Sequence, residues 1–389
     1  MRSGLEQIRE SLEAYLATPN DQPRTPDLFH YYSPDVYELE LEHVWRKEWI
    51  AVGHTAWLKQ PGDYFAWEIL GEPIVFVRGE DRKVRALSSV CRHRAVPVTQ
   101  DGERGNVKRF QCPYHLWTYG LDGKLAGAPF MTDNAGFDKT RIALPEFRVE
   151  VWNGIVFVNF DDDAAALAPR LEGLAPYFQF CDREDLVCNN VFVDVWNTNW
   201  KQAMENGDVY HGPGVHPEAM RVYEPLSMTE PTTCGGYWAR QVLGLDLEYY
   251  TRWYGFEPDK DEIGMVGRRR PAFDMTITFP ANFLMPTPAM LSIQANWPIS
   301  VDRTRVAMFS VAPPEFAAEE YTPEQYADPE GPNRINFQDS TVFDRGISRA
   351  VRSSRAKPGL MSPLQEGPAI ATHRWLARRL LTAIGGKSA

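Results

Sequence analysis

The sequence predicts an α+β protein of two domains, in which an all-β domain precedes a mixed α+β domain. Three observations support this fold class. The chain has 389 residues, which is long enough for two domains. Between residues 49 and 161, short alternating strand patterns are separated by turn signals such as Pro61-Gly62-Asp63. Between residues 162 and 389, strand-like and helical patterns are mixed, as in an α+β domain.

The N-terminal segment, residues 1–48, is predicted to be helical and to pack on the second domain. A first helix is predicted over residues 5–16, because apolar residues recur there at helical spacing: Leu5, Ile8, Leu12 and Leu16. A second helix is predicted from Pro34 to Glu48, where acidic residues enrich the start and apolar residues follow at helical spacing.

The remaining elements follow in the same way. In the all-β domain the clearest strand patterns are 64–67, 74–77 and 155–158. In the second domain, strands are predicted over 189–196, 275–279, 289–295 and 304–311. A long helix is predicted from about Pro363 to Ile384, with apolar residues along one side. No internal repeat interrupts this order.

Composition excludes several classes of function. The formal net charge of −11 argues against nucleic acid as a partner, because nucleic-acid binding needs a basic surface. No run of 18 uncharged apolar residues is present, so no membrane-spanning helix is expected. The N-terminus lacks the apolar region of a secretory signal. Five cysteines in a chain of this length, with no dense framework, indicate a reducing cytoplasm.

Two pairs of cysteine and histidine stand out in the first domain. Cys91 and His93 form a C-x-H pair, and Cys112 and His115 form a C-x-x-H pair. Each pair offers one thiolate and one imidazole, which suits a Rieske [2Fe–2S] cluster with one iron on sulfur and the other on imidazole. Zinc is an alternative, although zinc motifs usually keep cysteines and histidines in separate pairs. Ordinary buried residues are a second alternative.

A candidate iron site opens the second domain. His211 and His216 are five residues apart, and carboxylates stand nearby in the sequence. Two histidines and one carboxylate can hold Fe(II) in a facial triad that leaves positions open for O₂ and substrate. Gly212, Pro213 and Gly214 between the histidines are predicted to end a helix at His211 and let the chain fold back. Two unrelated histidines are the alternative.

Taken together, C-x-H…C-x-x-H and N-W-K…E-N…D-x-Y-H-x₄-H resemble the oxygenase α subunits of Rieske non-haem iron oxygenases, over nearly the whole chain. The resemblance implies a Rieske domain over 49–161 and a catalytic domain of the helix-grip (Bet v1-like) type over 162–389. It implies the following ligands: Cys91, His93, Cys112 and His115 for the cluster, and His211 and His216 for the iron.

The same resemblance assigns two carboxylates. Asp208 would bridge to a cluster histidine of the neighbouring subunit and carry electrons across the interface. Asp339 would be the third iron ligand, with Asp344 as the alternative. Family members commonly have two or three residues between the E-N pair and the bridging acid, but here only Gly207 stands between Asn206 and Asp208. The helix is therefore expected to be shortened or kinked at Gly207.

The resemblance implies a terminal oxygenase that uses O₂ and electrons from outside the chain. No G-x-G-x-x-G segment follows a strand, so NAD(P)H would act through a partner reductase, with or without a ferredoxin. A homotrimer is implied, with the cluster of one subunit facing the iron of the next. The resemblance to α subunits that act without a β subunit favours monooxygenation, including N- or O-demethylation. Cis-dihydroxylation of an arene and a Rieske electron carrier without an active iron site are the alternatives.

The substrate is not identified by the sequence. An aromatic stretch contains residues of the kind that cage a quaternary ammonium group: Tyr249, Tyr250, Trp253, Tyr254 and Phe256. Ordinary packing is the alternative for this stretch. Phe279, Phe283, Met285 and Met290 could line an apolar pocket or form the core of the sheet.

Overall fold

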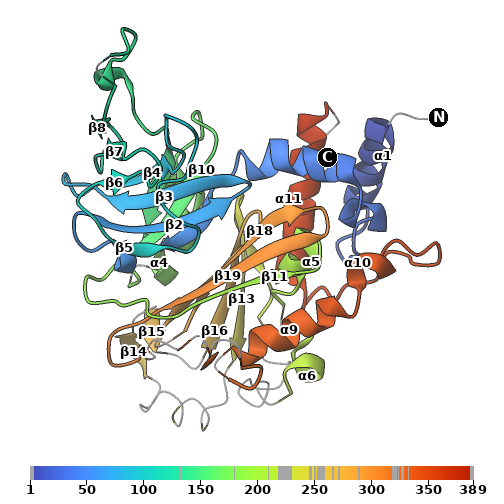
Figure 1. Ribbon diagram of the computed structural model, residues 1–389. Helices are drawn as coiled ribbons and strands as arrows, with labels where there is room; N and C mark the ends of the chain where they lie inside the picture. Colours follow the sequence, from blue (N-terminus) through green and yellow to red (C-terminus); the bar gives the residue numbers. More distant parts are fainter. Residues whose placement is uncertain are drawn as a thin grey trace.

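The computed structural model has two β-sheet lobes, with most of the long helices gathered on one side of the second lobe (Figure 1). It describes the following residues: 4–131, 133–178, 180–208, 210–217, 230–244, 248, 251, 259–264, 267–269, 272–287, 290–317, 322, 324–325, 328–331 and 333–385. Only the backbone is described for 259–264, 267–269 and 272–273.

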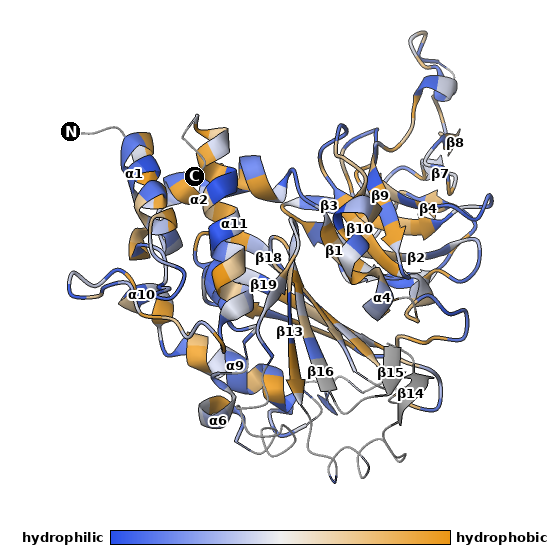
Figure 2. Cartoon of the chain, turned by 180° about the vertical axis from the view of Figure 1, so that it is seen from behind, coloured by the Kyte–Doolittle hydropathy of each residue, from blue (hydrophilic) through white to orange (hydrophobic). Residues whose placement is uncertain are grey.

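The N-terminal segment forms a helical layer that contacts the C-terminal helix. It contains α1 (Gly4–Leu16), η1 (Leu28–Tyr31), α2 (Pro34–Glu40) and the π-type turn η2 (Leu41–Trp45). α1 buries Ile8 and Leu12 on the predicted apolar face and lies against α11 (Gly367–Ala383). Figure 2 shows hydrophobic colour on one side of α1 and hydrophilic colour on the other.

The first lobe is an antiparallel sheet of seven strands in the order β1-β10-β9-β4-β3-β2-β5. Its strands are β1 (Ile50–His54), β2 (Asp63–Ile69), β3 (Glu72–Arg78), β4 (Val84–Ser88), β5 (Arg104–Asn106), β9 (Glu146–Trp152) and β10 (Ile155–Asn159). The predicted strands 64–67, 74–77 and 155–158 are confirmed as β2, β3 and β10. η3 (Thr55–Trp57) follows β1.

A smaller sheet sits at the end of the first lobe. It has three short strands, β6 (Phe110–Gln111), β7 (Thr118–Tyr119) and β8 (Leu125–Gly127), followed by η4 (Lys139–Arg141). The turn between β6 and β7 carries the second Cys-His pair, and the loop after β4 carries the first. After η4 the chain returns to the large sheet as β9 and β10, and it then leaves the lobe through α3 (Leu167–Arg170), η5 (Glu172–Leu174) and α4 (Ala175–Phe178).

The second lobe is built on an antiparallel sheet of seven strands in the order β11-β19-β18-β17-β16-β13-β12. These are β11 (Val191–Trp196), β12 (Thr233–Cys234), β13 (Trp238–Gly244), β16 (Ala272–Thr278), β17 (Asn282–Pro286), β18 (Leu291–Ser300) and β19 (Arg303–Val311). The four strands predicted in this region are confirmed, with β18 reaching further than expected. β14 (Asp259–Gly264) and β15 (Gly267–Arg269) form a separate pair.

Strand register separates the two faces of this second sheet. Phe283 and Gln294 are paired residues and share one face, while Trp297 and Arg305 share the other. The face with Trp297 packs against the first lobe, where Trp297 contacts Trp67. Helices cover the opposite face: α5 (Trp200–Glu205), α6 (Gly212–Val215), α9 (Arg334–Asp344), α10 (Ile347–Ala350) and α11. One sheet therefore separates the first lobe from the helical layer.

Three helix predictions need correction. α2 ends at Glu40 and continues as the wider turn η2 rather than as a helix to Glu48, and this turn buries Trp45 against Trp200. α11 begins at Gly367 rather than near residue 363, with a proline in its first turn, where proline is tolerated. Gly212–Val215 form the short helix α6 instead of ending one at His211.

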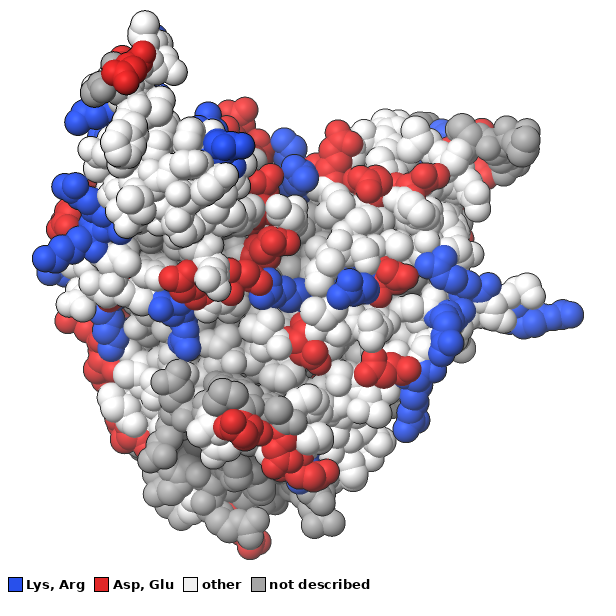
Figure 3. Space-filling view, viewed as in Figure 1, with Lys and Arg blue, Asp and Glu red and all other residues white. Residues whose placement is uncertain are grey.

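The surface of the molecule carries charges of both signs. Figure 3 shows Lys and Arg interspersed with Asp and Glu over the visible face. Within the part of the chain that the structure describes, no helix has both the length and the apolar character needed to cross a bilayer. The domain limits at residues 48 and 161 remain predictions.

Candidate metal centres

The two Cys-His pairs of the first lobe lie on loops with the same backbone design. In each loop, Cys91–Val96 and Cys112–Trp117, the cysteine N–H donates to the carbonyl five residues later. The N–H four residues later donates back to the cysteine carbonyl. That fourth residue, Ala95 or Leu116, has a positive φ, which closes each loop tightly. The shared design brings two cysteines and two histidines to one end of the lobe.

The side chains of these loops fit a [2Fe–2S] cluster. Cys91 and Cys112 are buried and free, and the His93 and His115 rings lie with their centroids 4.6 Å apart. The Nδ1 atoms of both rings are buried without a hydrogen-bond partner among the described residues. A buried ring nitrogen without a partner is costly unless a further group binds it. Two thiols and two such nitrogens are the donor set that a Rieske cluster needs.

Aromatic and basic residues surround the loops. The Tyr119 hydroxyl lies 3.2 Å from the Cys91 Sγ and accepts a hydrogen bond from the Arg92 N–H at 3.0 Å. The Trp117 ring stacks on the His93 ring. Desolvation, together with the neighbouring His93 and Arg94, lowers the pKa of His115. The neutral imidazole, which is the form that binds metal, is therefore favoured.

The Asn199-Trp200-Lys201 motif starts the helix that leads to the second site. Asn199 caps α5 by accepting a hydrogen bond from the Lys201 N–H. The Lys201 ammonium is 1 % exposed and donates to both oxygens of Glu40, at 2.7 and 2.8 Å. Glu40 also accepts from the Trp200 indole. Burial raises the pKa of Glu40 and lowers that of Lys201, and the pairing opposes both shifts.

α5 is short, as the sequence predicted from the spacing at Gly207. The helix ends at Glu205, which accepts hydrogen bonds from Tyr31 of η1 and His373 of α11, so the end of α5 is held by the N-terminal helical segment and the C-terminal helix. A Cβ built on Gly207 would lie 1.9 Å from the Phe283 ring. Only glycine can therefore pass this close to the sheet, and this close passage sets the position of Asp208 beyond it.

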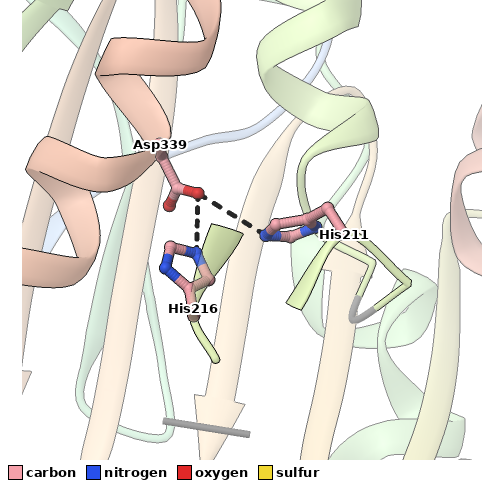
Figure 4. Close-up of side chains that lie close together, drawn as sticks. All are labelled: His211, His216 and Asp339. Atoms are coloured by element: carbon pink, nitrogen blue, oxygen red, sulfur yellow. Dashed lines mark hydrogen bonds and ion pairs between the residues drawn. The ribbon is translucent and has the colours of Figure 1, made fainter. Parts of the chain in front are cut away.

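His211, His216 and Asp339 converge on one point (Figure 4). The Asp339 Oδ1 lies 2.8 Å from the His216 Nε2 and 3.5 Å from the His211 Nε2. One ligand atom from each residue lies within 4.8 Å of the others. A single carboxylate oxygen facing two ring nitrogens is the donor set that a 2-His-1-carboxylate site offers to Fe(II). These three residues fit the metal that the sequence predicted.

The charges of the site are matched to one another. Burial acts against the His211 cation, but bonds to Asp208 and Asp339 outweigh it and raise its pKa from 6.5 to about 9. Burial alone would raise the pKa of Asp339, but its hydrogen bonds to the two histidines outweigh burial and lower that pKa. The raised pKa of His211 and the lowered pKa of Asp339 show that the negative charge of this site favours a cation, which a bound metal would supply.

Asp208 and Asp344 occupy different environments. The Asp208 Oδ1 accepts from the Tyr210 N–H at 2.7 Å and lies 3.3 Å from the His211 Nδ1. Asp208 therefore contacts a histidine of the site without joining the three converging residues. Asp344 is exposed at the end of α9 and accepts a hydrogen bond from Asn197. Asp339 and Asp344 were the two candidates for the third iron ligand, and of these only Asp339 lies beside His211 and His216.

Two contacts at these sites involve residues that the sequence did not single out. Tyr119 contacts Cys91, and the Gln338 Oε1 lies 2.8 Å from the His216 Nδ1. Tyr119 is seven residues beyond Cys112, and Gln338 stands next to Asp339. Neither residue belongs to a ligand pattern, so only proximity to predicted ligands could have suggested them.

The substrate candidates are only partly described. All five predicted cage residues of the aromatic stretch lie outside the described part of the chain, namely Tyr249, Tyr250, Trp253, Tyr254 and Phe256. Phe279, Phe283 and Met285 are buried in the main hydrophobic core, and Met290 is half-buried. Phe283 packs beneath Gly207, so this part of the core supports the segment that carries Asp208 and His211.

Two protein families match the chain. The Rieske [2Fe-2S] domain matches residues 48–148, and the catalytic domain of the ring-hydroxylating alpha subunit matches residues 182–382. The carnitine monooxygenase oxygenase subunit of Escherichia coli (strain K12) is 31% identical over 299 residues, which cover 75% of each chain. The 2-aminobenzenesulfonate 2,3-dioxygenase subunit alpha of Alcaligenes sp is 28% identical over 285 residues, or 71% of each chain.

Solved structures share the fold. A quaternary ammonium Rieske monooxygenase in complex with L-carnitine superposes with a TM-score of 0.76 at 24% identity, covering 94% of this chain and 98% of that one. Naphthalene 1,2-dioxygenase from Rhodococcus sp. bound to indole gives a TM-score of 0.75 at 22% identity, covering 97% and 98%. Both likenesses confirm the predicted order of a β domain followed by an α+β domain.

Proposed function

The chain belongs to the Rieske non-haem iron oxygenases, as an oxygenase α subunit, and we propose on this basis that it catalyses monooxygenation of a small organic substrate. The observation that carries the proposal is the convergence of His211, His216 and Asp339 in a chain that also carries two Cys-His loops. When bound, the cluster supplies single electrons and the Fe(II) activates O₂. The residues of the chain bind, orient and protect these groups.

We assign the ligands as follows, each supported by burial and proximity: Cys91, His93, Cys112 and His115 for the cluster, and His211, His216 and Asp339 for Fe(II). The neutral form of His115 leaves its ring nitrogen available for a metal. At the iron site, Asp339 and Asp208 hold the His211 ring from its two nitrogens. A carboxylate on each side of the ring fixes its orientation.

We propose a homotrimer in which electrons pass between subunits through Asp208. Within one chain, strands β6, β7 and β8 and the short helix α6 lie at opposite ends of the molecule in Figures 1 and 2. The Asp208 Oδ1 contacts His211 and Tyr210, and its second oxygen has no hydrogen-bond partner among the described residues, so it could bond to a neighbouring subunit. A carboxylate between two imidazoles would couple the metal pair of adjacent subunits. Inter-subunit electron transfer is described for a quaternary ammonium Rieske monooxygenase of similar structure, at 25% identity.

We propose that the substrate is a small amine or quaternary ammonium compound, oxidised at a carbon next to nitrogen. The supporting observation is the 31% identity to a carnitine monooxygenase oxygenase subunit over three-quarters of both chains. Oxidation at such a carbon would include oxidative demethylation. A partner reductase, with or without a ferredoxin, would supply electrons from NAD(P)H. A cytoplasmic location is proposed from the five free cysteines.

Metal content tests the proposal first. Protein purified without oxygen should hold about three irons and about two acid-labile sulfides per chain, with a Rieske-type EPR signal after reduction. Two irons and two sulfides, unchanged after incubation with Fe(II), would leave an electron carrier without an active iron site. Zinc without sulfide would overturn both centres.

Subunit mixing tests the electron route. Cys112→Ser should remove the cluster and Asp339→Asn the mononuclear iron, so each homotrimer should be inactive. Refolded or co-expressed mixed trimers should regain activity if electrons cross between subunits. Mixed trimers that remain inactive, with both metals present, would contradict transfer through Asp208.

Substrate oxidation tests the reaction type. L-Carnitine, γ-butyrobetaine and 2-aminobenzenesulfonate should be compared for substrate-dependent O₂ uptake with a reductase and NADH. With ¹⁸O₂, monooxygenation should place one labelled atom in the product. The second candidate is cis-dihydroxylation of an arene, favoured by the 28% identity to an arene dioxygenase over 71% of both chains. Two labelled atoms in an arene diol would establish that candidate instead.

A further inference from the structure

The geometry points to Gln338 as the residue that positions His216 for Fe(II), an inference that rests on the proposed function. The His216 ring is held at both nitrogens by neighbouring residues of α9. Its Nδ1 lies 2.8 Å from the Gln338 Oε1, and its Nε2 lies 2.8 Å from the Asp339 Oδ1. One helix therefore supplies both the carboxylate ligand and the group that orients a histidine ligand.

The chemistry of the amide selects which nitrogen of a neutral His216 ring carries the hydrogen. An amide oxygen can only accept a hydrogen bond, so the proton of a neutral His216 belongs on Nδ1. Nε2, on the side that faces Asp339 and His211, is then the ring nitrogen that would bind Fe(II). Metal-binding histidines commonly donate their second ring N–H to such an acceptor, which orients the ring and raises its basicity. Gln338 supplies this acceptor without adding charge.

The two histidines are held in different ways. The His211 Nδ1 lies 3.3 Å from Asp208, and the His211 side chain is 24% exposed. The His216 side chain is 8% exposed and has the shorter contact, to Gln338. Asp208 is also proposed to face a neighbouring subunit. The contacts that hold His216 therefore all come from its own chain, whereas Asp208 beside His211 would also contact a neighbouring subunit. Gln338 is the residue that sets the position of His216.

α9 is fixed firmly enough to act as this frame. Phe337 packs edge-to-face on Phe192 of β11, with ring centroids 5.9 Å apart. Phe343 stacks on Trp196 of the same strand at 4.9 Å. These contacts flank Gln338 and Asp339 along the helix. Changing the Gln338 side chain should therefore alter the hydrogen bond without releasing the helix.

Two substitutions of Gln338 separate the hydrogen bond from packing. Gln338→Met keeps the length of the side chain and removes the strong acceptor, whereas Gln338→Glu keeps an acceptor. Thr341→Ala changes an exposed position of the same helix and serves as the control. Each intact protein is loaded with Fe(II) without oxygen, and Fe(II) release to a ferrous chelator is timed. The EPR spectrum of the nitric oxide adduct reports the symmetry of the mononuclear iron.

Gln338→Met should weaken Fe(II) retention by about 10- to 100-fold, the usual effect of losing a group that orients a metal ligand. Gln338→Glu and Thr341→Ala should retain Fe(II) about as well as the wild type. The EPR signal of the reduced cluster should be unchanged in all three, which shows that each protein is folded. The nitric oxide adduct of Gln338→Met should change its rhombicity.

Wild-type retention in Gln338→Met would overturn the positioning role while leaving the iron site intact. Equal loss in Gln338→Met and Gln338→Glu would also overturn it, because shape rather than the acceptor would then matter. A wild-type protein that binds no mononuclear Fe(II) at all would overturn the proposed function, and this inference with it. The three results are distinguishable in the same chelator assay.

Discussion

The two candidate metal centres differ in how the chain assembles them. The Cys-His loops lie within residues 91–117 and share one backbone design, in which hydrogen bonds inside each loop set the geometry. The proposed iron site joins His211 and His216 to Asp339, which is 123 residues beyond His216. The residues of the first centre are close together in the sequence, whereas the second centre depends on how α9 packs on the sheet. A local site survives changes elsewhere better than a dispersed one.

The centres differ in charge as well. Arg92 and Arg94 are exposed beside the cluster loops, whereas Asp208 and Asp339 contact His211. The His115 pKa is lowered, and the His211 pKa is raised to about 9. These shifts favour the neutral imidazole of His115 at the first centre and the protonated imidazole of His211 at the second. Changes to acidic residues should therefore act mainly on the second centre.

The largest effect is expected from the carboxylate that joins the two histidines. Asp339→Asn removes the charge of the proposed third ligand while keeping the shape of the side chain. The mononuclear iron should be lost and turnover should fall by at least about 10³-fold, since the metal carries the O₂ chemistry. Iron content and EPR of the reduced protein measure both centres. The cluster should stay at about two irons and two sulfides per chain.

Asp344→Asn is the matched control for this prediction. Asp344 lies on the same helix but is exposed and bonded to Asn197. The variant should keep its mononuclear iron and its turnover. Loss of iron in Asp344→Asn and retention in Asp339→Asn would reverse the assignment of the third ligand. Loss of the cluster in Asp339→Asn would show that the two centres are not independent.

The difference between the centres also explains what the sequence could predict. Cys91, His93, Cys112 and His115 are identifiable because their spacing is local and their residue types are restrictive. Asp339 needed the family resemblance, since an isolated aspartate on a helix has no signature and Asp344 stood close by. Gln338 and Tyr119 were missed because hydrogen bonds to ligands leave no pattern in the sequence.

The fold shows the same limit. Short apolar strands bounded by turn signals, such as 64–67, 74–77 and 155–158, were predicted well, because an apolar run between turns is a local property of the sequence. The helix expected over Pro34 to Glu48 gave way to the turn η2, where burial of Trp45 against Trp200 outweighs helical regularity. Glu40 looked like an acid near a helix start, yet it is the buried partner of Lys201. Tertiary contacts decided these positions.

Gly207→Ala tests how strongly the iron site depends on packing. A methyl group at Gly207 would collide with the Phe283 ring, which must shift or push the chain segment away. Overpacking of this kind typically costs about 1–3 kcal/mol of unfolding free energy. We expect a lower urea midpoint, weaker Fe(II) retention and an unchanged cluster signal. Gly236→Ala is the control, because nothing lies within 4 Å of its added Cβ.

An unchanged Fe(II) retention in Gly207→Ala would show that Phe283 gives way without moving Asp208. In that case the iron site would be less dependent on the sheet than the comparison implies. An equal effect in Gly236→Ala would indicate a general sensitivity to alanine rather than a contact with Phe283.

His54 is a buried histidine whose two ring nitrogens both have hydrogen-bond partners within the protein, unlike the histidines of the cluster loops. Its Nε2 donates to the Cys181 carbonyl at 2.9 Å, and its Nδ1 accepts from the Ala56 N–H at 3.1 Å. Burial lowers the pKa of His54 from 6.5 to about 4. The folded protein therefore keeps this ring neutral where the unfolded chain binds a proton. Stability contributed by neutral His54 is present above about pH 6.5 and is lost as the pH falls toward 4.

Relative to neutral pH, the loss of stability caused by His54 should amount at pH 5 to about 2 kcal/mol of unfolding free energy. His54→Gln should be less stable than the wild type near neutral pH, but should lose less stability on acidification. Urea unfolding of both proteins at neutral pH and at pH 5 gives the comparison, and titration of every other group cancels between them. A parallel loss in both proteins would show that His54 does not titrate in this range.

The smallest effect is expected from Tyr119, whose hydroxyl lies 3.2 Å from the Cys91 Sγ. The Arg92 N–H already donates to this oxygen, so the phenol proton is directed toward the sulfur. A hydrogen bond to sulfur stabilises the more negative, reduced cluster and so raises its potential. Tyr119→Phe should lower the potential by about 40 mV, the equivalent of about 1 kcal/mol for a one-electron couple.

Potentiometric titration followed by EPR measures this shift, with Tyr64→Phe as the control. Tyr64 belongs to the same hydrophobic cluster but donates to Glu103 rather than to a ligand. Its variant should keep the wild-type potential, and both variants should keep their mononuclear iron. If the cluster loops are independent of the second centre, losing one hydrogen bond at Cys91 should affect only the cluster. Loss of the mononuclear iron in Tyr119→Phe would therefore show that the two centres are coupled.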